Sequence, residues 1–244
     1  MLKFISILIV SLSLLLTSAC GADKKEEPKD TSKAPETDTQ KEDAKTESDD
    51  VKVEKENTKT EKPADADEKL YKNKINFTIE MENGGVMKGE LYPDLAPKTV
   101  DNFVKLCKKN YYDGLIFHRV IENFMIQGGG YDDDMNLSKE TATIIGEFQS
   151  NGHKNPLKHT KGVISMARTN EPNSASSQFF IIHKDSPHLD GDYAAFGRIT
   201  EGLDIVDEIA TTDCENKQIF MGNQAITMSD VPVKPQVIKT IKIN

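Results

Sequence analysis

The chain has 244 residues, a formal net charge of −9 and three cysteines. An acidic chain is a poor candidate for nucleic-acid binding, because contacts from Lys and Arg to phosphate dominate that affinity. After about the first seventy residues the composition is that of a globular protein, which leaves enough chain for one domain with a substantial core.

Residues 1–19 have the pattern of a secretory signal peptide. Lys3 precedes an apolar run that is shorter than the ~20 residues needed to span a bilayer core. Small residues then lead into Cys20, which resembles the lipobox of bacterial lipoproteins, although Thr17 stands where leucine is most common. An ordinary cleaved signal with a chance cysteine is the alternative. We expect the Cys20 thiol to carry a diacylglyceryl group, with acyl chains such as palmitate, and two acyl chains anchor a protein stably.

Residues 20–69 are predicted to be the lipidated cysteine and a disordered, charged tether that follows it. The segment is rich in Lys, Glu, Asp and Thr and contains almost nothing that could bury surface. Pro28, Pro35 and Pro63 interrupt any local helix. Fully stretched, the segment reaches roughly 160 Å, so we expect it to hold the folded domain at a distance from the membrane.

The predicted domain, residues 70–244, opens with two strands and a helix. Apolar and polar residues alternate over 74–81, which predicts a half-buried strand. A glycine-rich turn at 83–85 leads into a returning strand over 86–92. The apolar period then changes to that of a helix within 93–109.

Short strands continue along the rest of the chain. The pattern predicts strands over 115–120, 124–127, 162–167, 178–183, 195–199 and 237–243, and a second helix over 203–210. Many short strands with two helices indicate a mainly β fold, an antiparallel barrel capped by helices.

The cysteines, histidines and aspartates give no redox or metal motif. Cys107 lies on the apolar face of the first predicted helix, which favours a buried thiol, while a disulfide with Cys214 stays open. The histidines lack ligand spacing. Residues 132–134 are three aspartates without the spacing and glycine of an EF-hand, which favours a solvated loop over a calcium site. We expect neither a metal nor a cofactor.

Several segments resemble the cyclophilin-type peptidyl-prolyl cis-trans isomerases. In chain order they read FHRVI-x-x-FMIQGG from Phe117, GVISMAR from Gly162, SSQFFI from Ser176 and HLDGDYAAFGR from His188, followed by the alternating terminal strand. The resemblance runs from about residue 74 to 243. It implies a closed eight-stranded antiparallel barrel with a helix at each end, and isomerisation of peptide bonds that precede proline.

The resemblance implies two catalytic residues. Arg119 is the guanidinium within FHR, and Gln127 is the amide that holds it and bonds the substrate backbone. Arginine stays charged and has no acceptor role, so it suits an electrostatic part in the reaction. Without the resemblance, a surface salt bridge is the alternative interpretation of Arg119.

A second set of residues is implied to bind the substrate. Four apolar side chains receive the proline ring and five others surround it: Phe124, Met125, Phe180 and Leu189, then Ala167, Arg168, Gln178, His188 and Tyr193. Periodicity alone would more often place the four apolar residues in the core. Phe179 is expected to face the core instead.

Three of these positions depart from the family pattern. His188 stands where many cyclophilins have the tryptophan that hydrogen-bonds cyclosporin, Tyr193 where a histidine is common, and Arg168 where an asparagine is usual. We expect catalysis to survive these changes and cyclosporin to bind only weakly.

These observations predict a monomeric, lipid-anchored isomerase on the outer face of the cell membrane. Its partners would be proline-containing polypeptides after export, for which proline isomerisation is a slow folding step. One rival is a binding module with the same fold and no useful turnover, which a turnover assay on a proline tetrapeptide distinguishes. A solute-delivering lipoprotein is a second rival, but it would need a larger, two-lobed chain.

Overall fold

The computed structural model describes residues 71–139, 141–221 and 224–244. The predicted signal peptide, Cys20, the tether and the first residue of the predicted domain lie outside these ranges. Within them, no helix has both the length and the apolar character that a membrane span requires.

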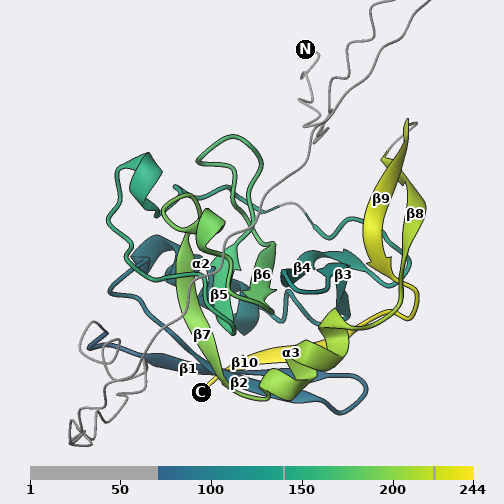
Figure 1. Ribbon diagram of the computed structural model, residues 1–244, viewed down its shortest axis with the longest axis horizontal. Helices are drawn as coiled ribbons and strands as arrows, with labels where there is room; N and C mark the ends of the chain where they lie inside the picture. The colour runs from purple at the N-terminus through teal and green to yellow at the C-terminus, as the bar shows by residue number, and fades with distance from the viewer. Residues whose placement is uncertain (1–70, 140, 222–223) are drawn as a thin grey trace, which may run out of the picture. The chain divides into compact units, whose positions relative to one another are not determined.

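Eight strands form one antiparallel sheet that curls until its edges almost meet (Figure 1). Their order across the sheet is β10-β1-β2-β7-β5-β6-β4-β3. The strands are β1 (Ile75–Met81), β2 (Val86–Leu91), β3 (Leu115–Ile121), β4 (Met125–Asp132), β5 (Val163–Met166), β6 (Phe179–Ile182), β7 (Ala195–Glu201) and β10 (Ile238–Ile243). A bridge between Ile116 and Val237 joins the edge strands β3 and β10. The predicted eight-stranded antiparallel barrel is therefore confirmed, in nearly closed form.

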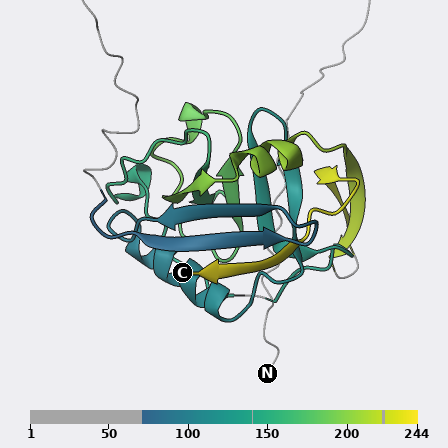
Figure 2. The ribbon, with the colours of Figure 1, turned by 90° about the horizontal axis from the view of Figure 1, so that it is seen from below.

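The alternating sequence of β1 explains its place in the wall of the barrel. Phe77, Ile79 and Met81 are buried, while the residues between them are partly exposed. Successive side chains of a strand point to opposite faces, so one face of β1 lines the core. Figure 2 shows β1 with its neighbours β2 and β10 on either side.

Helix α2 (Pro97–Lys108) supplies the largest helical contribution to the core. It begins with proline, whose fixed φ suits the first helical position. The buried carboxylate of Glu147 accepts hydrogen bonds from the backbone N–H groups of Lys98 and Thr99, at 3.1 and 2.8 Å. Phe103 is fully buried and meets Phe179 edge-on at 5.5 Å, so Phe179 faces the core as predicted.

Helix α3 (Leu203–Ala210) has the bounds that the sequence predicted. Its buried residues Val206 and Ile209 belong to the same core cluster as Phe103 of α2. Two short 3-10 turns, η1 (Gln149–Asn151) and η2 (Pro187–Leu189), lie in the long connections around β5 and β6.

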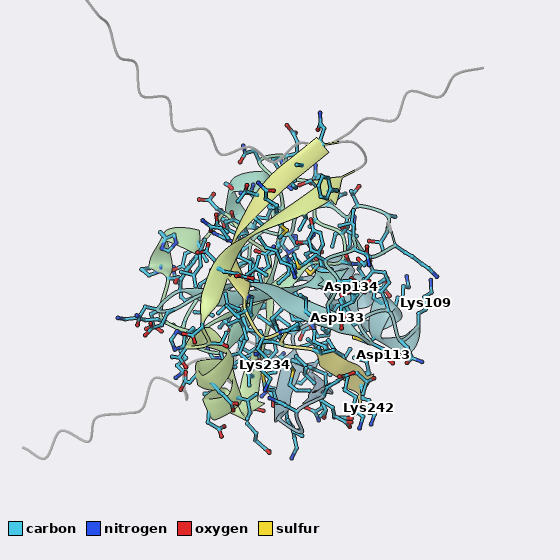
Figure 3. All side chains as sticks on the ribbon, turned by 90° about the vertical axis from the view of Figure 1, so that its right-hand side faces the viewer. Lys109, Asp113, Asp133, Asp134, Lys234 and Lys242 are labelled. Carbon is cyan, nitrogen blue, oxygen red and sulfur yellow. The ribbon has the colours of Figure 1, made fainter. Side chains whose placement is uncertain are left out.

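A second sheet, a hairpin of β8 (Cys214–Met221) and β9 (Gln224–Pro232), was not predicted. Val231 and Ile219 of the hairpin pack with Ile116, Tyr131 and Met135 in a small core of their own. The hairpin therefore lies against the β3–β4 side of the barrel (Figure 1). Figure 3 looks onto that side, which carries charged residues of both signs.

Both cysteines of the domain are free thiols. Cys107 is buried, and burial raises its pKa to about 12. Cys214 is exposed at the start of β8. In the part of the chain that the structure describes, no three His, Cys, Asp or Glu side chains are grouped as metal ligands.

Candidate active site

Arg119 and Gln127 are cross-strand partners on β3 and β4. The Arg119 side chain is 41% exposed, and the preceding His118 is buried. The His118 side chain is thus shielded from solvent, while that of Arg119 reaches it. Burial lowers the pKa of His118 to about 4, which keeps its imidazole neutral at pH 7.

Gly130 of β4 makes room for the side chain that contacts Gln127. Its amide Nε2 donates to Oε1 of Gln178 at 2.9 Å. A Cβ on Gly130 would lie 2.6 Å from the Gln178 side chain, and Gly129 has a φ of +82°. Gly129 therefore needs glycine for its backbone conformation, and Gly130 leaves the space that the Gln178 side chain occupies.

A cavity of about 130 Å³ collects most of the predicted site residues. Its lining consists of Arg119, Phe124, Met125, Gln127, Ala167, Arg168, Phe180, Leu189 and Tyr193. Met125, Phe180 and Leu189 are nearly fully buried and form an apolar floor. Strands β3, β4 and β6 and the turn η2 supply five of these residues, and the segments before β4, after β5 and after η2 supply the others. The cavity thus sets one half-exposed guanidinium beside a surface suited to a small apolar ring.

Arg168 forms one wall of this cavity. Its Nε and Nη2 donate to the carbonyl oxygen of Asp192, at 3.0 and 2.9 Å. Its guanidinium carbon lies 4.6 Å from the ring centroid of Tyr193 and 5.0 Å from that of Phe148. The arginine is thereby fixed between two aromatic rings, and Phe148 was not among the predicted residues.

Two predicted residues lie beside the cavity rather than in its lining. Gln178 restrains the Gln127 side chain through the hydrogen bond described above. His188 is exposed on η2, and its ring lies 5.4 Å from that of Phe124. His188 therefore extends the aromatic rim.

A larger cleft of about 440 Å³ lies near the site and has a different character. Glu122, Asp213 and Asp230 line it together with Thr211 and Thr212, and its lining contains no lysine or arginine. The smaller cavity is the better candidate for an apolar proline ring, because it alone combines the buried apolar floor with Arg119.

The comparisons with known proteins agree with this geometry. A model of the cyclophilin type peptidyl-prolyl cis-trans isomerase/CLD family matches residues 76–243. The chain belongs to this family of isomerases.

Bacterial relatives share this assignment over most of the domain. The chain is 42% identical over 175 residues to the peptidyl-prolyl cis-trans isomerase cyp18 of Streptomyces antibioticus, covering 68% of this chain and 98% of that protein. It is 36% identical over 170 residues to peptidyl-prolyl cis-trans isomerase B of Escherichia coli, covering 66% and 96% of the two chains.

Solved cyclophilin structures have the same fold. A cyclophilin-type isomerase of Cryptosporidium parvum aligns with a TM-score of 0.56 at 27% identity, over 70% of this chain and 98% of that one. A second crystal structure of that protein, in the presence of the dipeptide Ala-Pro, gives a TM-score of 0.55. The chain is thus a cyclophilin-type peptidyl-prolyl cis-trans isomerase.

Proposed function

We propose that this cyclophilin isomerises prolyl bonds of exported polypeptides while anchored to the outer face of the cell membrane, with Arg119 as its catalytic group. The observation that supports the chemistry is the shared cavity of Arg119 and the apolar floor. The anchor and the location are supported by the sequence around Cys20.

The reaction requires the prolyl amide to twist out of its plane. The rotation barrier is ~18–20 kcal/mol, and the uncatalysed process takes tens to hundreds of seconds. Reaching milliseconds is an acceleration of about 10⁴ to 10⁵, which corresponds to lowering the barrier by roughly 6 kcal/mol. No covalent bond is made or broken, so binding that favours the twisted amide is sufficient.

Arg119 supplies such differential binding. A twisted amide loses resonance, so its nitrogen becomes pyramidal and a better hydrogen-bond acceptor. A guanidinium fixed beside the proline donates more strongly to this state than to the planar one. Arginine stays charged at every relevant pH, so this contribution does not depend on a proton transfer.

The apolar floor holds the ring while the bond rotates. Met125, Phe180 and Leu189 offer a buried surface for the pyrrolidine, and Phe124 and Tyr193 flank it. The cavity of about 130 Å³ is sized for one such ring. In this arrangement the proline is held and the preceding carbonyl swings past Gln127 and Arg119.

Anchoring would place the enzyme where exported chains arrive unfolded. The proposed tether of about 49 residues would let the domain reach tens of ångströms from a lipidated cysteine. Because the tether carries many acidic residues, we expect it not to adhere to an anionic envelope.

The test of this proposal separates the anchor from the chemistry. The full chain and its Cys20→Ala variant are expressed in a bacterium that makes lipoproteins, fed with a labelled fatty acid, and fractionated. We expect label and membrane association for the wild type only, and equal turnover of an Xaa-Pro tetrapeptide by both proteins. A correctly cleaved, membrane-bound Cys20→Ala protein would contradict the anchor; a purified wild type without turnover would contradict the chemistry.

A further inference from the structure

Arg119 has an acidic neighbour from the hairpin that the sequence did not predict. The Nε atom of Arg119 lies 3.8 Å from Oδ2 of Asp230 on β9, and the two side chains are 41% and 42% exposed. Arg119 lines the proline cavity, whereas Asp230 lines the larger acidic cleft. The ion pair therefore lies between the proline cavity and the acidic cleft.

The backbone of β9 is irregular at this residue. Asp230 has a φ of +62°, in the left-handed region that only glycine and, less often, asparagine and aspartate adopt readily. Val231 pairs with Glu215 and Met228 with Lys217, so two residues of β9, Ser229 and Asp230, stand opposite one residue of β8. This is a β-bulge, a feature that redirects a side chain and is frequent beside active sites.

The bulge is held firmly against the strand that carries Arg119. Val231, the next residue, is 1% exposed, and Ile219 of β8 is 5% exposed. Both pack against Ile116 of β3 in the small core of the hairpin. Asp230 is thus held by a packed scaffold. A carboxylate in a freely moving loop would orient the guanidinium much less.

We infer that Asp230 is a positioning residue for Arg119. Its carboxylate attracts the Nε side of the guanidinium and restricts the rotamers of a long, half-exposed side chain, so that the group is already in place when the amide twists. This inference rests on the proposed role of Arg119. Asp230 acts only through Arg119, so its loss should slow the chemical step and leave proline binding on the apolar floor nearly unchanged.

The alternative is a surface ion pair without consequence, since exposed pairs often contribute little. The experiment therefore measures kcat and KM separately, by NMR exchange on an Xaa-Pro peptide, for the wild type, Asp230→Asn and Arg119→Ala. Asp213→Asn is the matched control, because Asp213 lines the same cleft directly before β8 without belonging to the ion pair. Asparagine keeps the size of aspartate and tolerates the left-handed backbone.

We expect Asp230→Asn to lower kcat roughly threefold to fivefold, as loss of a modest exposed ion pair allows, with KM within about twofold. Asp213→Asn should match the wild type. Adding Asp230→Asn to Arg119→Ala should cause no further loss, because coupled residues are not additive. If Asp230→Asn folds poorly, Asp230→Gly removes the carboxylate at a backbone position that suits glycine, and the same fall in kcat is expected.

A wild-type kcat in Asp230→Asn or Asp230→Gly would overturn the inference while leaving the role of Arg119 intact. An equal loss in the Arg119→Ala background would overturn it as well, because it would show that Asp230 acts elsewhere. Normal turnover by Arg119→Ala would remove the basis of both this inference and the proposed mechanism.

Discussion

The side chains of Gln127 and Gln178 are joined by a hydrogen bond of 2.9 Å, in space that Gly130 leaves open. Gln127 faces the cavity from β4, and Gln178 approaches it from the segment just before β6. The three residues form one unit, in which a missing side chain allows two amides to meet. Restraining a substrate-facing amide in this way reduces the freedom it must lose on binding.

Gly130→Ala should therefore impair turnover more than stability. The new Cβ would lie 2.6 Å from the flexible end of the Gln178 side chain, which can move aside but then releases Gln127. We expect kcat/KM to fall about tenfold or less, the range that one neutral hydrogen bond accounts for. Turnover and thermal unfolding of the same sample check this; unchanged turnover in a folded Gly130→Ala protein would show that the pair has no part in activity.

The stability of the domain should fall in mild acid because of His118. Burial holds its folded-state pKa at about 4, whereas an unfolded histidine titrates near 6.5. Between these values the unfolded chain binds a proton that the folded chain does not, so stability is lost as pH falls from about 6.5, by roughly 3 kcal/mol at most. Burial also lowers the pKa of His159, which acts in the same direction.

Urea unfolding at pH 7 and pH 5 measures this effect, because both pH values lie above the pKa of most carboxylates. The free energy of unfolding should drop between the two pH values, and His118→Phe should show a smaller drop. An equal drop in both proteins would assign the pH dependence to other groups.

The start of the folded domain should be set by Tyr71. Its ring stacks on Tyr92 at 4.1 Å, and the following backbone N–H groups of Lys72 and Asn73 donate to Asp94. A chain beginning at Lys69 should keep the melting temperature and turnover of the full mature chain. A chain beginning at Lys74 should melt several degrees lower, since burial of one aromatic side chain contributes about 1.5–3 kcal/mol. Thermal unfolding of the three chains decides the matter, and a large loss already at Lys69 would mean that the tether packs on the domain.

His188 should set the sensitivity to cyclosporin. The imidazole lies at the exposed rim beside Phe124 and offers less apolar area than the tryptophan of many cyclophilins. We expect His188→Trp to tighten cyclosporin binding clearly and to change kcat/KM only modestly, because the proline ring depends on the floor. Inhibition constants measured for both proteins test this, and equal values would show that the position does not govern drug binding.

The strands and helices of the barrel could be predicted because each has a buried face. Ile79 alternates with polar neighbours, and Val206 and Ile209 follow helical spacing. The spacing of apolar residues therefore indicates which side chains are buried. The resemblance to cyclophilins, carried by several segments, predicted the site residues, and nine of them line one cavity.

The β8–β9 hairpin was missed because its apolar alternation is short and largely confined to Ile226 and Met228 of β9. Most of β8 is polar, and Phe220 is 76% exposed. The available signal was the Gly222-Asn223 dipeptide between two short stretches, a pair typical of two-residue hairpin turns. Asp230 could not be linked to Arg119 without that hairpin, since a bulge and a tertiary contact together bring them within reach.

The most direct test of the mechanism is the turnover of Arg119→Ala and Arg119→Lys, measured by NMR exchange on an Xaa-Pro peptide with folding checked by thermal unfolding. Removing a preorganised donor to a transition state typically raises the barrier by a few kcal/mol, so kcat/KM of Arg119→Ala should fall at least about tenfold. Arg119→Lys should restore little, because an ammonium cannot reproduce the planar fork of a guanidinium. A folded Arg119→Ala protein with near-normal turnover would contradict the account.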